Sequence, residues 1–239
     1  MKIDVYFTPL GAKEGEFAGR GVVVIDVLRA TSTIVTAIAS GARAVVPTAT
    51  SEEAVRLTTN LERDGFVLAG ERRFLKVDGF AYGNSPREMT PDAVGGKTVF
   101  LATTNGTPAL VATQGAEPVL VGAAVNFSAL VESARALFHE RGDLVIVCAG
   151  HDRQFSLEDA YTAGRLIRAV KARLRKLELN DAGEVALELA SRYAGWKDAF
   201  EHSRAARQLG ELGLADDVAF CAKPDRFSVV PAYAERRIT

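Results

Sequence analysis

The feature that most limits the fold of this chain is a regular alternation of short apolar runs and helix-forming segments. Residues 21–27, GVVVIDV, form a β-branched run that begins at a glycine, and residues 32–41 have helical character and end at Gly41. Residues 42–49, 50–65 and 66–70 then repeat the order strand, helix, strand. Strands separated by helices predict parallel βαβ units and therefore an α/β fold.

The second part of the chain repeats this order. Thr31 and Thr107 occupy the same place in each unit, and the Ala-Gly pair of VLAGERRF (67–74) returns in VCAGHDRQF (147–155). Any two βαβαβ runs share some likeness, but these matches favour an internal duplication. We therefore predict parallel or mixed sheets flanked by helices, built from two similar βαβαβ halves facing one another. The first half covers 1–90, and the second covers 91–239 with extra C-terminal helices.

Composition excludes several classes of partner. The chain has 239 residues, 48% hydrophobic and 25% charged, with a net charge of −1, so no electrostatic case exists for nucleic acid or an anionic membrane. No apolar run reaches the ~18 residues of a membrane span. The two cysteines, Cys148 and Cys221, lie far apart without metal-binding spacing. We expect a cytoplasmic protein with a small anionic phosphorylated substrate, and leave a homodimer open.

Several polar residues follow predicted strands directly. Because ligands of parallel sheets bind at the carboxyl ends of the strands, the turns at Asp26, Glu71, Asn105 and Cys148 should converge. Asp26 ends a buried strand, where a carboxylate serves as a helix cap, a metal ligand or a catalytic group. Arg29 follows three residues later and is placed to bind an anion through two nitrogens.

Four hydroxyl-rich or basic turns supply candidate substrate contacts. Thr31 and Ser32 open a helix whose N–H groups favour phosphate, although they also fit a plain helix start. After the third strand, Glu71 precedes two arginines, and only one of these can face the site. Turn chemistry alone explains the YGNSP and TTNGTP segments, but their amides and hydroxyls also suit an oxyanion. The candidate substrate-binding residues are Arg29, Thr31, Ser32, Arg72, Asn84, Ser85, Asn105, Gly106 and Thr107.

The segment SLEDA (156–160) carries two acids with different explanations. Ser156 and Asp159 have capping-box spacing, which leaves Glu158 without a structural role. Together with Asp26, these acids would hold magnesium through oxygen ligands, as a metal-assisted phosphatase requires. Buried cysteines are more often small apolar residues than nucleophiles, which makes Cys148 a wall of the site in this interpretation. The candidate catalytic residues are Asp26, Glu71, Cys148 and Glu158, and the candidate metal ligands are Asp26, Glu158 and Asp159.

Familiar phosphatase patterns do not fit, but one family does. Leu28 stands where the haloacid dehalogenase pattern needs an acid, Cys148 and Arg153 are one residue too close for a tyrosine phosphatase loop, and no P-loop lysine motif is present. In contrast, an ordered set of short motifs over nearly the whole chain resembles the 2-phosphosulfolactate phosphatase family of coenzyme M biosynthesis. These motifs are DVLRATSTIVTA, GER, GFAYGNSP, TTNGTPAL, CAG, FSLEDAYTAG and DDVAFCAKPDRFSVVP.

The resemblance implies a magnesium-dependent hydrolase that converts (R)-2-phospho-3-sulfolactate, or a closely related phospho-hydroxy acid, to its hydroxy acid and phosphate. The chain departs from the family at AGERRF and at AGHDRQF, where His151 and Asp152 replace smaller residues. Two alternatives remain open. One is an isochorismatase-like cysteine hydrolase using Asp26 and Cys148, with Lys76 or Lys97 as its lysine. The other is a non-catalytic anion-binding α/β module.

Overall fold

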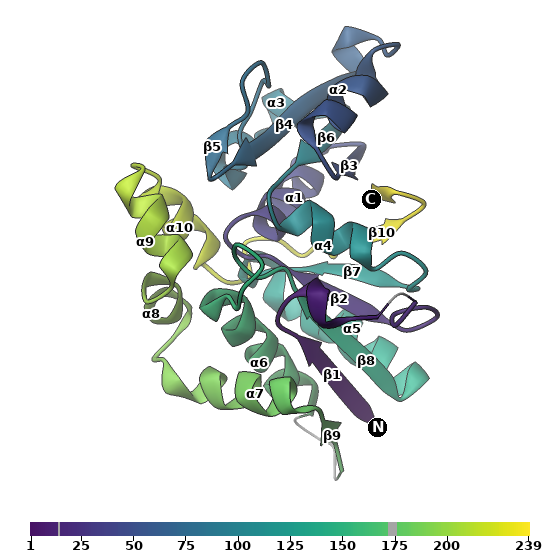
Figure 1. The fold of residues 1–239 in the computed structure, drawn as a ribbon, viewed down its shortest axis with the longest axis vertical. Coiled ribbons are helices and arrows are strands. Elements are labelled where there is room, and N and C mark those ends of the chain that lie inside the picture. The colour runs from purple at the N-terminus through teal and green to yellow at the C-terminus, as the bar shows by residue number, and fades with distance from the viewer. Residues whose placement is uncertain (14, 172–175) are drawn as a thin grey trace.

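The chain forms one large mixed sheet flanked by helices, which confirms the predicted α/β class (Figure 1). The structure, a computed structural model, describes residues 1–13, 15–171 and 176–239. Within these residues no helix has the length and apolar character needed to cross a membrane. The strands are β1 (Lys2–Tyr6), β2 (Val22–Ile25), β3 (Ala44–Thr48), β4 (Phe66–Arg72), β5 (Leu75–Lys76), β6 (Thr98–Ala102), β7 (Val119–Gly122), β8 (Asp143–Cys148), β9 (Glu178–Leu179), β10 (Ala232–Ala234) and β11 (Arg237–Ile238).

Helices connect the parallel strands and add a helical region after β9. They are α1 (Ala30–Ala39), α2 (Ser51–Thr58), α3 (Pro91–Val94), α4 (Gly106–Ala112), α5 (Phe127–Arg141), α6 (Leu157–Lys171), α7 (Asp181–Arg192), α8 (Trp196–Glu201), α9 (Arg204–Glu211) and α10 (Ala215–Cys221). The helix predicted for 50–65 is shorter than expected, because α2 ends at Thr58. The hydroxyls of Thr58 and Thr59 donate to carbonyls of the preceding turn, a contact that disfavours continued helix. The amphipathic pattern of residues 155–176 predicts one helix that begins near Ser156, and residues 172–175 of that segment lie outside the described residues.

The strand order shows that the two halves of the sequence exchange their first strands. The sheet runs β5-β4-β6-β3-β11-β10-β7-β2-β8-β1-β9. Thus β6 inserts between β3 and β4, while β2 inserts between β7 and β8, each in parallel. The central eight strands are therefore arranged symmetrically about the middle of the sheet. From one end the order is β4, β6, β3, β11, and from the other end the corresponding strands are β8, β2, β7, β10. This is the order expected of a duplication; the duplication itself and its boundary at residue 90 stay predictions, which superposing the halves would test.

A short C-terminal hairpin joins the two parallel groups of strands. β11 pairs antiparallel with β3 only through Ile238 and Val45, and β10 pairs antiparallel with β7 through two residues. In Figure 1 the strands β3, β4 and β6 therefore form an upper layer that is turned relative to the lower group around β2, β7 and β8. The hairpin is the seam at which the sheet changes direction.

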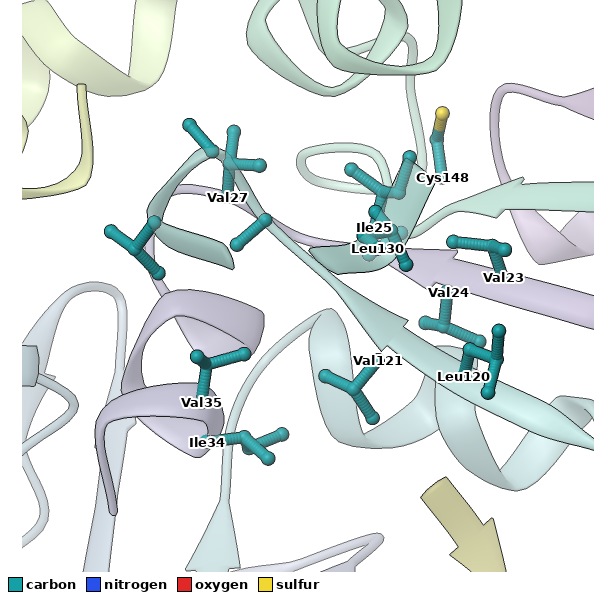
Figure 2. Close-up of a cluster of buried hydrophobic side chains, with 14 of the residues drawn as sticks. Val23, Val24, Ile25, Val27, Ile34, Val35, Leu120, Val121, Leu130 and Cys148 are labelled. Carbon is teal, nitrogen blue, oxygen red and sulfur yellow. The ribbon is translucent and has the colours of Figure 1, made fainter. Parts of the chain in front are cut away.

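The core is built where the exchanged strand β2 is buried on both faces. Every residue of β2 is buried, as expected for a central parallel strand. Figure 2 shows Val23, Val24 and Ile25 packed among side chains of α1, α5 and β7. Asp26 directly follows this close-packed strand, so the packing of β2 fixes the position of its backbone.

The seam hairpin can be tested by removing its one fully buried side chain. We expect Ile238→Ala to lower the free energy of unfolding by about 2–5 kcal/mol, because Ile238 belongs to the main core. Arg237→Ala, on the exposed side of the same strand, should change it by less than about 0.5 kcal/mol. Urea unfolding of both variants measures this. If both variants lost the same free energy of unfolding, the burial of Ile238 would not be what stabilises the hairpin.

Candidate active site

The turns predicted to converge line one cavity of about 310 Å³. Its walls come from the residues after four parallel strands, two from each group: β2, β4, β6 and β8. Another side is covered by Gln208 and Glu211 of helix α9 and by Leu212, the residue after that helix. The other lining residues are Asp26, Leu28, Arg29, Glu71, Arg73, Phe74, Asn84, Thr104, Asn105, His151 and Asp152. The convergence predicted for Asp26, Glu71 and Asn105 is therefore confirmed.

Asp26 both caps a helix and lines the cavity. The N–H of Ala30 donates to its Oδ1 at 3.2 Å, so the cap interpretation is correct for one oxygen. Its Oδ2 accepts no hydrogen bond from the described residues and lies toward Gly106. Burial, and then the charges of Glu71 and Glu158, raise the pKa of Asp26 to about 7, although the Ala30 N–H and Arg29 act in the opposite direction. This carboxyl therefore changes protonation near neutral pH.

Two further buried carboxylates hold the loops that carry the site. Glu71 accepts the N–H groups of Thr104 and Phe74, each at 2.7 Å. Asp159 accepts the N–H of Val27 at 2.9 Å and that of Gly150 at 3.3 Å. The capping-box explanation of Asp159 is thus wrong, because its carboxylate reaches across to the end of β2. Glu71, at the end of β4, therefore fixes the loop that follows the neighbouring strand β6. Asp159, in the first turn of α6 after β8, fixes the loop that follows β2, the neighbour of β8.

The side chain of Arg29 is held from two directions. Its Nη1 donates to Asp217 at 2.6 Å and its Nη2 donates to the carbonyl of Phe74 at 2.8 Å. Nε is buried and has no hydrogen-bond partner among the described residues. With two nitrogens already engaged, Arg29 can offer a ligand this third N–H.

Asp217, on α10, was not predicted to belong to the site. It is 1% exposed and also accepts the hydroxyl of Ser85 at 2.6 Å. Ser85 therefore supports Arg29 through Asp217, and it does not line the cavity. The only earlier signal for Asp217 was its place in the motif that begins DDVAFCAKPD.

A glycine allows the two crossing helices to meet at the cavity. A Cβ at Gly106 would lie 2.3 Å from the Cβ of Ala30 and 2.6 Å from Oδ2 of Asp26. Such distances are far below van der Waals contact, so any side chain would separate the starts of α1 and α4. Gly106 thus belongs to the site through its lack of a side chain.

The predicted hydroxyl contacts are instead used by the backbone. Thr31 Oγ1 exchanges hydrogen bonds with the N–H and carbonyl of Asp26, and Thr107 Oγ1 does the same with Thr103. Ser32 donates to the carbonyl of Val27. All three side chains are fully buried and none lines the cavity. The matching roles of Thr31 and Thr107 agree with their predicted equivalence.

Among the remaining candidates, only some reach the cavity. Arg73 lines it, whereas Arg72 lines a different cavity beside α2. Glu71 points inward and side chains alternate along β4, so Arg72 lies on the opposite face of the strand. Asn84 is buried at the cavity with an unpartnered Oδ1 among the described residues. His151, noted only as a departure from the family pattern, lines the cavity and stacks on Phe74 with centroids 5.3 Å apart.

Cys148 and the lysines of the cysteine-hydrolase alternative lie elsewhere. Cys148 is fully buried in the apolar core beside Ile25, as Figure 2 shows, and does not line the cavity. Burial, and then the charges of Asp159 and Glu158, raise the pKa of its thiol well above the usual value. Lys76 lines the cavity beside α2, and Lys97 donates to the carbonyl of Ala93. These positions do not assemble a cysteine-based site.

Comparison with known proteins decides the family. The family model described as 2-phosphosulpholactate phosphatase matches residues 6–236. The chain belongs to the 2-phosphosulfolactate phosphatase family. A relative from Caldanaerobacter subterraneus is 40% identical over 97% of this chain and 95% of its own, and one from Clostridium acetobutylicum is 38% identical over the full length of both. A third, from Thermotoga maritima, is 37% identical over 96% of this chain and 94% of its own. Each carries the name probable 2-phosphosulfolactate phosphatase.

The acids of this family member do not form a ready-made metal cage. The described residues contain no group of three or more His, Cys, Asp or Glu side chains arranged to hold an ion. Of the three metal candidates, Asp26 lines the cavity, Asp159 has both oxygens occupied by N–H groups, and Glu158 lines a separate cavity. Of these three predicted ligands, only Asp26 therefore presents a free carboxylate oxygen at the cavity.

The raised pKa of Asp26 makes stability depend on pH in a defined direction. The pKa of Asp26 is higher in the folded protein than in the unfolded chain. The protonated Asp26 carboxyl therefore contributes to the free energy of unfolding in full below about pH 4, and this contribution is lost as the pH rises through about 7. The shift from 3.8 to about 7 corresponds to roughly 4 kcal/mol as an upper limit. We expect Asp26→Asn to be more stable than the natural protein at about pH 8 and to lose this advantage near pH 4.

Denaturant unfolding over this pH range measures the difference. Asp64→Asn, which removes an exposed carboxylate, serves as the control and should follow the natural protein at every pH. An Asp26→Asn variant that is less stable at pH 8 would show that the carboxylate is stabilised by its surroundings.

Proposed function

We propose that this protein is a magnesium-dependent phosphatase that hydrolyses (R)-2-phospho-3-sulfolactate, or a closely related phospho-hydroxy acid, to sulfolactate and phosphate. The observation that carries the proposal is the full-length family match together with Asp26 and Arg29 at one cavity. The reaction would be a step of coenzyme M biosynthesis. The two cysteines are free and buried, which supports a reducing cytoplasmic location, and a homodimer stays a prediction for sedimentation to test.

The cavity suits a small substrate that carries several anionic groups. Its volume of about 310 Å³ is at the low end of the range usual for small-molecule sites. Arg29 offers Nε from a rigid position, and the exposed Arg73 can approach from the turn after β4. The amides of Asn84 and Asn105 line the same cavity and can donate to phosphate, carboxylate or sulfonate oxygens. These four side chains are the ones that we expect to bind the anionic groups of the substrate.

The residues fit a Mg²⁺ ion held by one protein carboxylate and by substrate oxygens, the arrangement common for this ion at phosphate sites. Asp26 supplies a free carboxylate oxygen, while neighbouring Glu71 and Glu158 add negative charge that raises its pKa. A cation bound beside Asp26 would stabilise the ionised form and offset the charge of the phosphate. Glu71 and Asp159 would keep the loops of Asp26 and Asn105 in place through their N–H bonds.

Hydrolysis breaks the bond between phosphorus and the C2 oxygen, while water supplies the new oxygen of the phosphate and the proton of the alcohol. In this reaction Asp26 would hold the cation, and Arg29 holds an anionic group of the substrate. Since Arg29 is fixed by Asp217 and Phe74 before substrate binds, little ordering is needed on binding.

The proposal is tested by Asp26→Asn. We expect this variant to fold, because amide and carboxylate are nearly isosteric and Asn can still cap α1. Turnover of 2-phosphosulfolactate should fall by roughly two or more orders of magnitude, because the ionisable oxygen at the cavity is lost. The assay measures phosphate release with magnesium and then with a chelator, which should abolish turnover by the natural protein. If Asp26→Asn turned over the substrate at nearly the natural rate and with the same magnesium dependence, Asp26 would act only as the N-cap of α1.

Cys148 provides the test against the cysteine-hydrolase alternative. We expect Cys148→Ser to keep turnover within about tenfold of the natural enzyme, because the thiol does not reach the cavity. Stability should fall by about 1–3 kcal/mol, since a hydroxyl is placed in an apolar site. Cys148→Ala is the companion variant without a buried hydroxyl. A loss of about 10³ in both variants, or a trapped phosphocysteine, would make the thiol a nucleophile.

A further inference from the structure

A second cavity lies next to the candidate active site, on the other side of His151. It has a volume of about 220 Å³ and shares only His151 with the first cavity. Its floor comes from the segment that starts α6, including Ser156 and Glu158, and its rim comes from α9, including Arg204 and Arg207. The active-site residues that α9 supplies, such as Gln208, come from further along the same helix.

Two buried polar atoms at this cavity have no partner among the described residues. Ser156 is 4% exposed, and its Oγ makes no well-formed hydrogen bond within the described chain, although the carboxyl groups of Glu158 and Asp159 lie next to it; burial raises the pKa of both, and the Ser156 hydroxyl acts to lower it. The predicted capping box is therefore not formed at this helix. The Nε2 of His151 is also buried and without a hydrogen bond there, although Asp152 Oδ2 lies 3.4 Å away. A buried hydroxyl without a partner is costly, so both atoms point to a ligand that would satisfy them.

The charges around the cavity favour an anion. Arg204 and Arg207 line its rim and are exposed, and the N-terminal ends of α6 and α9 both lie at its lining. The guanidinium of Arg207 is oriented by a hydrogen bond from Nη1 to the carbonyl of His202. Glu158 is the one acidic side chain among the described lining residues; it is buried, and burial raises its pKa. Asp152 lies next to the lining, with its Oδ2 4.0 Å from a guanidinium nitrogen of Arg204.

We propose that this second cavity binds a tetrahedral oxyanion, for which inorganic phosphate is the probe. The hydroxyl of Ser156 and Nε2 of His151 would contact its oxygens from the floor, and Arg204 and Arg207 would balance its charge from the rim. The site is separate from the cavity of the proposed reaction, so it does not depend on which phosphate ester the protein hydrolyses. Because His151 lines both cavities, an anion bound here contacts a side chain that also faces the active site.

Direct binding of phosphate to the full chain tests this proposal. Isothermal titration should detect phosphate in the natural protein, and Ser156→Ala should weaken that binding by about tenfold, the value of one lost hydrogen bond to a charged group. The paired change Arg204→Ala with Arg207→Ala should weaken it by at least as much. Ser156→Ala should also raise the Tm in phosphate-free buffer, because a buried hydroxyl without a partner is removed.

Arg192→Ala is the matched control, since it removes an exposed arginine from α7, away from this cavity. It should leave phosphate affinity within about twofold. The proposal is overturned if the natural protein binds no phosphate, if neither the Ser156 nor the arginine variant weakens binding, or if Arg192→Ala weakens it equally. Failure of the proposed phosphatase activity would appear separately, as absent phosphate release from 2-phosphosulfolactate while this binding persists.

Discussion

The structure depends on the close approach of two helices at the point where the chain crosses between its two groups of strands. After β2 the chain enters α1 and leaves for β3, and after β6 it enters α4 and returns to β7. The two crossings meet at Ala30 and Gly106, where no Cβ can be accommodated on the second residue. This contact brings Asp26 beside the turn of Asn105, so the site exists because the strands are exchanged.

The loops after β2 and β6, where the chain crosses, contain buried backbone N–H groups that need hydrogen-bond acceptors. Glu71 and Asp159 meet this need, since each places two carboxylate oxygens against N–H groups in the interior. Buried charges of this kind are stable only when hydrogen-bonded, and removing an acceptor would leave N–H groups unsatisfied. Glu71 has a second effect, because its charge adds to that of burial in raising the pKa of Asp26.

The cationic side of the site is fixed in a comparable way. Arg29 is 3% exposed and forms an ion pair with Asp217, which also accepts a hydrogen bond from Ser85. A buried ion pair adds little net stability but sets one orientation of the guanidinium. Segments from α1, the loop before Pro86, and α10 are thereby joined at the cavity. The helical C-terminal region thus contributes to the site through Asp217 as well as through α9.

The α/β class, the end of the first helix near Gly41, the helix cap at Asp26 and the convergence of Asp26, Glu71 and Asn105 could be predicted from the sequence, because they follow from local patterns and from the rule that strand ends hold the ligand site. Tertiary structure decided which side chains remain free there. Thr31, Ser32 and Thr107 are used by their own loops, and Arg73 reaches the cavity in place of Arg72. The partners of Arg29 and Asp159 come from strands and helices far along the chain, and local patterns carry no record of such long-range pairing. The contact of Asp159 with Val27 follows from the placement of β2 beside β8, and that of Glu71 with Thr104 follows from the placement of β6 beside β4.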